Sequence, residues 1–320
     1  MQIIFIILGS LILLGILYEQ YSRYKTKKLY PIKGEFVDVG GHQLHYVKKG
    51  SGDATIIFES GADFGGHVIW KNIQNKLSEN FSTLSYDRSG ILHSERGNNP
   101  KDSESMAQEL HTMLEKLDLP KPYIFVGHSL AGITLRYFIK KYPKDVAGAI
   151  LLDPSHPEMI EHLPKKIQKT LTLSPPRWLL SLLIYTGIPR IVFSKIIEVS
   201  VTNAHASAKK NYKEALANIH KGFNSGYADE YLSLEQLLNE TKGIEFDTIP
   251  IILLGATKVP MDKKEYYETI EIMTTLHHKT LEHSLNGKYI AIDSGHIIQA
   301  EKPDLVVEVV EEFTKEVLKK

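Results

Sequence analysis

The feature that most constrains the fold is an alternation of short apolar runs with longer segments of helical spacing. Apolar runs of strand length occur at 54–60, 81–87, from Tyr123 onwards, and at 146–153, 249–256 and 287–293. Between them, segments such as the one that Ser103 opens carry apolar residues every three or four positions, which is typical of amphipathic helices. Strands that alternate with helices predict an α/β protein with a mostly parallel, doubly wound sheet.

Two details refine this prediction. Residues 35–39 and 42–47 flank Gly40-Gly41 and predict a β-hairpin before the alternation starts. The last helix is expected to begin at Pro303, because a proline at the first helical position loses no hydrogen bond.

The alternation is interrupted once. Residues 155–246 contain no convincing strand pattern and several helical stretches. We therefore expect a core formed by residues 29–154 and 247–320, with residues 155–246 as a helical cap inserted between the sixth and seventh strands. In such sheets reactive groups gather at the carboxyl ends of the strands.

Residues 1–28 differ from the rest of the chain, because no charge occurs before Glu19 and a basic cluster, 23–28, follows. A helix from residue 1 to residue 18 would be about 27 Å long, slightly short of the ~30 Å hydrocarbon core of a bilayer. The basic leader and the cleavage site of a signal peptide are both missing. We expect a single-pass anchor in the cell membrane with the folded domain on the cytoplasmic side. A buried core helix is the alternative, and cleavage of the segment stays open.

Composition narrows the chemistry. The 320 residues carry 38 basic and 38 acidic side chains, so the charge balance does not point to nucleic acid as a partner. The absence of cysteine excludes disulfides, thiolate metal sites and a cysteine nucleophile. We expect no metal and no organic cofactor.

The segment Gly127-His128-Ser129-Leu130-Ala131 lies between an apolar strand and an amphipathic helix. This is the context of a nucleophile elbow, where a serine occupies a strained turn and the residues two positions away must be small. Gly127 and Ala131 meet that requirement. We predict that Ser129 is the nucleophile and that the Leu130 N–H stabilises developing negative charge. A plain turn with a capping serine is the alternative.

A serine hydroxyl needs a base. His296 is the candidate, because it follows the last strand in a Ser-Gly-His turn. Of the other histidines, His128 is expected to pack beside the elbow, and His277 and His278 to lie on a helical segment.

The imidazole in turn needs an acid to orient it, and the sequence offers three. Asp153 ends the sixth strand, Asp262 follows the seventh, and Asp293 stands three residues before His296. Position favours Asp153 over Asp262, with Asp293 last.

The glycine-rich segment FESGADFGG, residues 58–66, follows the third predicted strand. Backbone N–H groups of such a loop can approach a substrate, so we predict that Ala62 N–H joins Leu130 N–H in an oxyanion hole. A flexible loop before a helix is the alternative. Asp87 and Arg88, after the fourth strand, are expected to hold their own loop in place rather than to react.

The motifs ESGAD, YDRSG, GHSLAG, ILLDPSHP and SGH, in this order from about residue 35 to the C-terminus, resemble those of the α/β-hydrolase superfamily. The motif ESGAD is similar to that of the branch whose oxyanion loop reads Glu-Ser-Gly. In that branch the strand before the cap ends in Leu-Val-Asp-Pro, which is similar to Leu151-Leu152-Asp153-Pro154 here. The resemblance implies the α/β-hydrolase fold, with these site residues: Ser129, His296, Asp153, Ala62 and Leu130. Two positions depart from the pattern, since Ala131 and Leu92 stand where glycine is common.

The resulting hypothesis is a membrane-anchored serine hydrolase that cleaves a small-molecule carboxylic ester, and the apolar cap segment 178–193 favours a hydrophobic acyl group. A peptidase or an acyltransferase shares the acyl-enzyme and stays open, as does a haloperoxidase-like side activity. Haloalkane dehalogenases and epoxide hydrolases need an aspartate where Ser129 stands and are disfavoured. A catalytically silent ligand-binding module is the alternative from another class.

Overall fold

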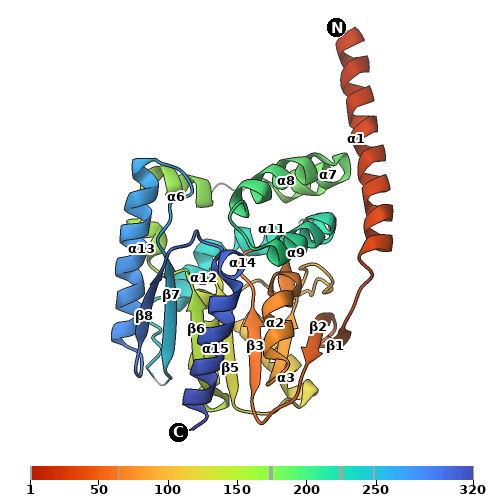
Figure 1. Ribbon diagram of the computed structural model, residues 1–320. Helices are drawn as coiled ribbons and strands as arrows, with labels where there is room; N and C mark the ends of the chain where they lie inside the picture. Colours follow the sequence, from red (N-terminus) through yellow and green to blue (C-terminus); the bar gives the residue numbers. More distant parts are fainter. Residues whose placement is uncertain (1, 64, 173–175, 223–225, 248, 320) are drawn as a thin grey trace.

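The computed structural model describes residues 2–63, 65–172, 176–222, 226–247 and 249–319. One eight-stranded sheet runs through its centre in the order β1-β2-β4-β3-β5-β6-β7-β8 (Figure 1). The pairs β1–β2 and β2–β4 are antiparallel, and every pair from β4 to β8 is parallel. The predicted mostly parallel sheet is confirmed. The strands are β1 (Glu35–Asp38), β2 (Gln43–Lys49), β3 (Thr55–Glu59), β4 (Ser82–Tyr86), β5 (Tyr123–His128), β6 (Val146–Leu152), β7 (Ile251–Ala256) and β8 (Lys288–Ile292).

The predicted hairpin is also confirmed. Asp38 pairs with Gln43, and the Val39 N–H donates to the His42 carbonyl at 2.9 Å. Gly40 and Gly41 then form the turn with φ of +119° and +96°, a backbone region that favours glycine.

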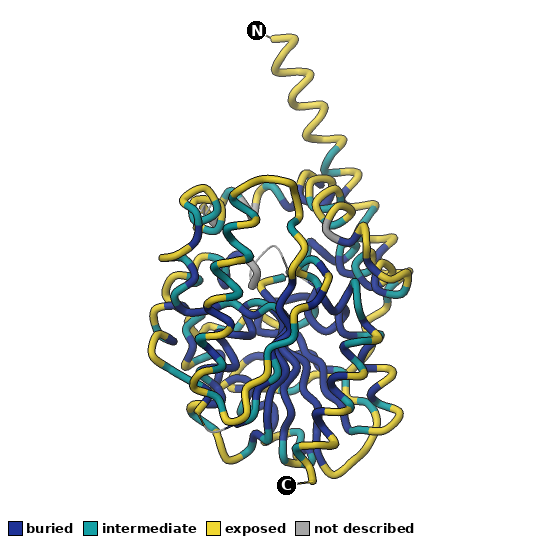
Figure 2. Tube along the Cα trace, turned by 60° about the vertical axis from the view of Figure 1, so that its left-hand side comes forward, coloured by how far each residue is buried: buried dark blue, intermediate teal, exposed yellow. Residues whose placement is uncertain are grey.

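Helices cover both faces of the sheet. Along β5, Tyr123 and Phe125 pack into one apolar core while Ile124 and Val126 pack into the other, as the alternation of side chains in a strand requires. The first face is covered by α3 (Ser103–Leu117), α4 (Ala131–Lys141) and α13 (Lys264–Glu282). The second is covered by the 3₁₀ segment η1 (Gly66–Trp70), α2 (Lys71–Leu77) and α15 (Pro303–Val317). Figure 2 shows the sheet as the buried centre of the molecule.

The helix boundaries follow capping residues. Asp102 is the N-cap of α3, since its side chain accepts from the Ser105 N–H at 2.7 Å, so Ser103 is the first helical residue as predicted. Pro303 opens α15, also as predicted. The segment after β3 begins as the 3₁₀ turn η1 and continues as α2, and the His67 N–H in this turn donates to the Asp87 carboxylate at 2.8 Å.

All described residues between β6 and β7 are helical or irregular, and these helices lie above the carboxyl end of the sheet (Figure 1). They are α5 (Met159–His162), α6 (Lys165–Thr172), α7 (Arg177–Leu183), the 3₁₀ turn η3 (Ile184–Thr186), α8 (Ile188–Ser200), α9 (Ala206–Ala217), α10 (Ile219–Gly222), α11 (Gly226–Leu232) and α12 (Leu234–Thr241). We call them the cap.

The N-terminal segment is one continuous helix, α1 (Gln2–Leu29), and Met1 lies outside the described residues. The helix is long and apolar enough to cross a membrane. Residues 2–14 are exposed throughout and project away from the domain (Figure 1). The basic residues expected to form a linker continue the helix, because its second half packs against the cap.

Candidate active site

Ser129 occupies the turn between β5 and α4. Its φ is +53°, a left-handed conformation that is strained for a residue with a side chain. Three hydrogen bonds stabilise the turn. The Ser129 N–H donates to the Leu152 carbonyl at 3.1 Å, and the Ser129 carbonyl accepts from the N–H groups of Gly132 and Ser155 at 2.9 and 2.8 Å.

Close packing explains the small residues around this serine. A Cβ on Gly127 would stand 2.6 Å from the Cβ of Ala131, and a Cβ on Gly132 would stand 2.4 Å from the Ser155 carbonyl oxygen. Larger side chains would push α4 away from β5 and move the serine. The expectation that Gly127 and Ala131 must be small therefore has a physical basis in the structure.

Three predicted residues meet at the carboxyl edge of the sheet. His296 lies between β8 and α14 (Ile298–Glu301), and its Nε2 is 3.1 Å from the Ser129 Oγ. Its Nδ1 is 2.6 Å from an Asp153 carboxylate oxygen. The two other acids lie elsewhere: Asp262 accepts from the Tyr267 hydroxyl, and Asp293 pairs with a lysine.

Asp153 is placed by the end of β6. Its φ is +41°, its N–H donates to the Leu254 carbonyl at 2.7 Å, and its second carboxylate oxygen accepts from the Ala256 N–H at 3.1 Å. Burial acts to raise the pKa of Asp153, but the hydrogen bond to His296 and the charge of that ring outweigh burial and lower it. The carboxylate is therefore ionised at neutral pH.

Asp153 has the opposite effect on His296. Desolvation acts to lower the pKa of His296, but the hydrogen bond and the charge of Asp153 outweigh it and raise the pKa above its ordinary value. Because Nδ1–H donates to the carboxylate, Nε2 is the nitrogen that faces the serine hydroxyl. This is the tautomer in which an imidazole can accept a proton from Ser129.

Two further histidines support these residues; His128 lies beside the elbow and His277 on a helix as predicted, but the sequence patterns did not reveal their hydrogen-bond partners. Burial lowers the pKa of His128 to about 3, so its ring is neutral, and Nε2–H donates to the His296 carbonyl at 3.0 Å. His277 on α13 is also buried, and its Nε2 lies 2.9 Å from the carbonyl oxygen of Pro154, which follows Asp153. His128 stood within the elbow motif, whereas nothing in the helical spacing of His277 indicated its partner.

The loop that carries Ala62 runs beside the serine. A Cβ on Gly61 would lie 3.0 Å from the Ser129 Cβ and 3.0 Å from a ring nitrogen of His128. Within the described part of the chain, the N–H groups of Ala62 and Leu130 donate to no protein acceptor. Both are thus available for a ligand. Phe64, in the same motif, lies outside the described residues.

Arg88 holds this loop from below. It donates to the carbonyl oxygens of Ser60 at 2.6 Å and Gly61 at 2.7 Å, and it pairs with the buried Glu59 at 2.9 Å. It also binds both carboxylate oxygens of Glu230 on α11, at 2.7 and 2.8 Å. Burial acts to lower the pKa of Arg88, but the two glutamates outweigh it and hold it well above its usual range. Arg88 therefore positions the loop after β3 and joins it to the cap.

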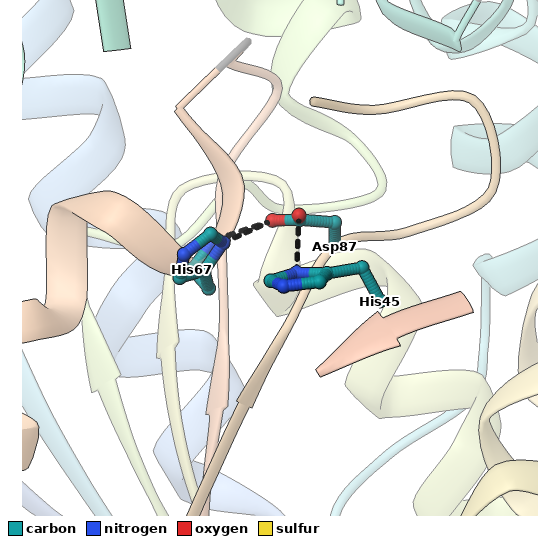
Figure 3. Close-up of side chains that lie close together, drawn as sticks. All are labelled: His45, His67 and Asp87. Atoms are coloured by element: carbon teal, nitrogen blue, oxygen red, sulfur yellow. Dashed lines mark hydrogen bonds and ion pairs between the residues drawn. The ribbon is translucent and has the colours of Figure 1, made fainter. Parts of the chain in front are cut away.

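Asp87 is the centre of a second buried cluster (Figure 3). Its two carboxylate oxygens accept from Nδ1 of His45 and Nδ1 of His67, both at 2.9 Å, and the His93 N–H lies 3.3 Å away. Burial acts to raise the pKa of Asp87, but the two imidazoles outweigh it and hold it well below its usual range. The predicted role of Asp87 in holding its own loop is confirmed by the contact with His93.

The same cluster has the residue types of a metal site. The ligand atoms of His45, His67 and Asp87 lie within 4.8 Å of one another. Nitrogen ligands must give up their protons to a metal, but both Nδ1 atoms lie at donor distance from the carboxylate, and His45 Nε2 lies 2.7 Å from the Lys33 carbonyl oxygen. The hydrogen bonds account for these contacts, and we assign the cluster a structural role.

Leu92 stands where glycine is common in the family that the motifs resemble. It keeps a φ of +47°, the left-handed region that glycine favours. Its side chain is buried with Val68 of the core and with Ile184 and Ile219 of the cap. The leucine therefore adds apolar contact between core and cap.

Comparison with known proteins agrees with the observed fold. A family model described as alpha/beta hydrolase fold matches residues 56–179. The uncharacterized protein YbdG of Bacillus subtilis is 26% identical over 264 residues, which cover 80% of each chain. The (lyso)-N-acylphosphatidylethanolamine lipase of Mus musculus is 31% identical over 120 residues, 36% of this chain and 33% of the lipase. An epoxide hydrolase of Bacillus megaterium has a similar structure, with a TM-score of 0.66 and 19% identity over 88% of this chain and 100% of that chain.

Proposed function

This chain belongs to the α/β-hydrolase superfamily, and from that premise we propose that it is a serine hydrolase acting on carboxylic esters. The observation that carries the proposal is the position of His296 between Ser129 Oγ, at 3.1 Å, and Asp153, at 2.6 Å. A nucleophile, a base and an orienting acid in mutual contact are the arrangement that acyl transfer requires.

The reaction follows from the geometry. Ser129 Oγ attacks the ester carbonyl carbon while its proton passes to His296 Nε2. The carbonyl oxygen becomes an oxyanion that accepts from the N–H groups of Ala62 and Leu130. When the tetrahedral intermediate collapses, the carbon–oxygen bond to the alcohol breaks, His296 protonates the leaving oxygen, and the acyl group stays on Ser129.

Water completes the cycle. His296 takes a proton from the water, the oxygen attacks the acyl carbon, and collapse of the second intermediate returns the proton to Ser129 and releases the acid. Asp153 stabilises the imidazolium formed in both halves, and the same interaction raises the pKa of His296. Arg88 keeps Gly61 and thereby the adjoining Ala62 N–H beside the serine.

Ser129 is also the reason to prefer this chemistry over that of the epoxide hydrolase whose structure is similar. Opening an epoxide through an ester intermediate needs a carboxylate nucleophile, and a serine cannot supply one. A peptidase or acyltransferase would use the same residues and differ only in the leaving group or acceptor. A ligand-binding module that does not react would have no need of the strained turn at Ser129.

The proposed substrate is a hydrophobic acyl ester handled at a membrane. The lipase relative acts, by its name, on a phospholipid, and α1 is apolar over residues 2–18 with basic residues after it. We place the chain in the cell membrane through α1, with the catalytic domain on the cytoplasmic side.

Labelling of the full-length protein with a fluorophosphonate probe tests the nucleophile. Ser129→Ala is expected to abolish the label, and Ser105→Ala at a half-buried position of α3 is expected to keep it. Persistent labelling of the Ser129→Ala protein would contradict the assignment. Hydrolysis of esters of increasing acyl length, measured alongside aminoacyl amides, then separates esterase from peptidase activity.

A further inference from the structure

The second half of α1 and the cap form one unit. Glu19, which is 1% exposed, accepts two hydrogen bonds from Arg190 of α8, at 2.8 and 2.9 Å. A bidentate pair of this kind sets the relative orientation of its two helices. Further up, Gly15 touches the cap so closely that a Cβ there would stand 2.3 Å from the Thr186 carbonyl oxygen. From Gly15 onwards, therefore, α1 cannot move independently of the cap.

The cap carries an exposed apolar surface next to this contact. Six side chains on α7 and α8 are between 46% and 69% exposed: Trp178, Leu182, Ile188, Ile191, Val192 and Val199. We call them the α7–α8 platform. The four on α8 are spaced by three, one and seven residues and so lie on one side of that helix. Contiguous apolar surface of this kind marks an interaction site.

The platform lies where α1 leaves the domain. Helices α7 and α8 form the end of the molecule beyond which the first residues of α1 project (Figure 1). Those projecting residues, 2–14, are all exposed. The platform and the free part of α1 thus lie at the same end of the molecule.

The length of the projecting part of α1, residues 2–14, indicates that the platform also enters the lipid. Residues 2–14 extend about 20 Å as a helix, which falls short of the ~30 Å hydrocarbon core. An apolar helix face immersed in the interface lies roughly 5–10 Å deep. With the platform at that depth, the end of α1 reaches about 25–30 Å and crosses the core.

Charge around the platform favours the same partner. Helix α8 and its neighbour α9 carry four exposed lysines, Lys195, Lys209, Lys210 and Lys213, and one exposed acidic side chain, Glu198, although the whole chain is balanced. Lysines beside an apolar surface are attracted to anionic phospholipid headgroups. A phospholipid leaflet matches both properties of this face.

We propose that the α7–α8 platform is immersed in the leaflet on the domain's side of the membrane, so that the cap faces the bilayer. The inference rests on the proposed anchoring by α1 and deepens it: the membrane contact is made by the cap as well as by the helix. The Glu19–Arg190 pair holds the two parts at a common level.

The test uses the full-length protein, one copy per nanodisc of phosphatidylcholine and phosphatidylglycerol at three to one. Trp70 and Trp178 are the two tryptophans, and Trp70 is 0% exposed in the core. Lipids with brominated acyl chains are expected to quench about half of the fluorescence, and Trp178→Phe is expected to remove the quenched component. Unchanged emission of the wild-type protein would overturn the proposal.

Charged variants sharpen the result. Ile191→Glu with Val192→Glu is expected to reduce the quenching at least threefold. Leu285→Glu is the matched control, because Leu285 is 53% exposed but adjoins the amino end of β7, opposite the cap. Equal quenching in the double variant and the control would contradict immersion of α8. Thermal unfolding of each variant verifies that it is folded.

A variant with a single cysteine in α1 tests membrane anchoring by α1 separately from immersion of the platform. In the cysteine-free chain, Leu8→Cys is expected to resist a water-soluble maleimide in the nanodisc. Protection of this cysteine without quenching of Trp178 would refute immersion of the platform but keep anchoring by α1. Modification of the cysteine by the maleimide would refute anchoring by α1 as well. A second copy of the chain is the other possible occupant of the platform. Cross-linking through the platform in nanodiscs with two copies, together with no quenching in single-copy nanodiscs, would identify that occupant and refute immersion in the leaflet. Fluorophosphonate labelling tests the catalytic proposal independently.

Discussion

The carboxyl edge of the sheet and the cap above it are held in place in different ways. At the edge, β3 and β5 are buried along their whole length, and β6 over most of its residues, and parallel hydrogen-bond ladders align their ends. In the cap, α6 contains no buried residue, and polar pairs make the specific joints to the neighbouring parts. Arg88–Glu230 joins cap to core and Arg190–Glu19 joins cap to α1.

This difference bears on function. Ser129 and Asp153 directly follow the ends of β5 and β6, and many buried side chains together fix the positions of these strand ends. The cap shares apolar contacts with the core, such as those of Leu92, but its polar joints depend on a few buried charges, each of which one substitution removes. We therefore expect changes at the edge to affect chemistry with the fold intact, and changes at the joints to affect stability and the cap.

The largest effect is expected for Asp153→Asn. The amide cannot stabilise the His296 imidazolium, so kcat on a simple ester should fall on the order of 10⁴-fold, while the free energy of unfolding changes little. Steady-state kinetics and chemical denaturation measure the two quantities. Asp262→Asn is the control. A greater loss of kcat in that variant would show that Asp262, and not Asp153, is the acid.

The next effect is expected at the joint between core and cap. Glu230→Gln removes one partner of a buried ion pair and should lower the free energy of unfolding by about 3–5 kcal/mol, with loss of activity as Arg88 releases the loop at Gly61. Glu235→Gln, exposed on the neighbouring helix α12, serves as the control. Denaturation with unchanged midpoint would show that the cap is not held by this pair.

A smaller loss is expected at the joint between cap and α1. Glu19→Gln leaves the Arg190 guanidinium buried without its charged partner, at a cost of about 2 kcal/mol. Because this joint lies away from Ser129, kcat on a soluble ester should stay within about twofold of the wild-type value. Limited proteolysis in detergent should cut the variant faster near residue 190. A kcat loss as large as that of Glu230→Gln would mean that the two joints are coupled.

The smallest effect is expected in the pH profile. His296 must be neutral to act as base, and its pKa lies above the ordinary value, so kcat/KM should rise with pH through a midpoint above ~6.5. Removing the Asp153 charge lowers that pKa, so the residual activity of Asp153→Asn should have its midpoint at lower pH. A shift in the other direction would show that Asp153 does not hold the imidazole in its charged form.

Much of the edge was predictable because its signals are local. Period-two and continuous apolar runs identified the strands, and Gly127 and Ala131 identified the elbow from steric requirements within five residues. The choice among Asp153, Asp262 and Asp293 was not local, because it depends on β6, which Asp153 follows, lying beside β5, which Ser129 follows, and on the position of His296 between the two side chains. The supporting contacts of His128 and His277 depend in the same way on neighbours more than 100 positions away.

By itself, the sequence determined the α/β character, the interruption by a helical segment, the apolar N-terminus and the candidate nucleophile, because periodicity and small-residue spacing act over a few positions. Only the tertiary structure decided that His296 meets Ser129 and Asp153, that Arg88 joins loop and cap, and that α1 continues past its apolar part onto α8. These features need distant segments to be brought together, and the energy that brings them together comes from burial of the whole sheet.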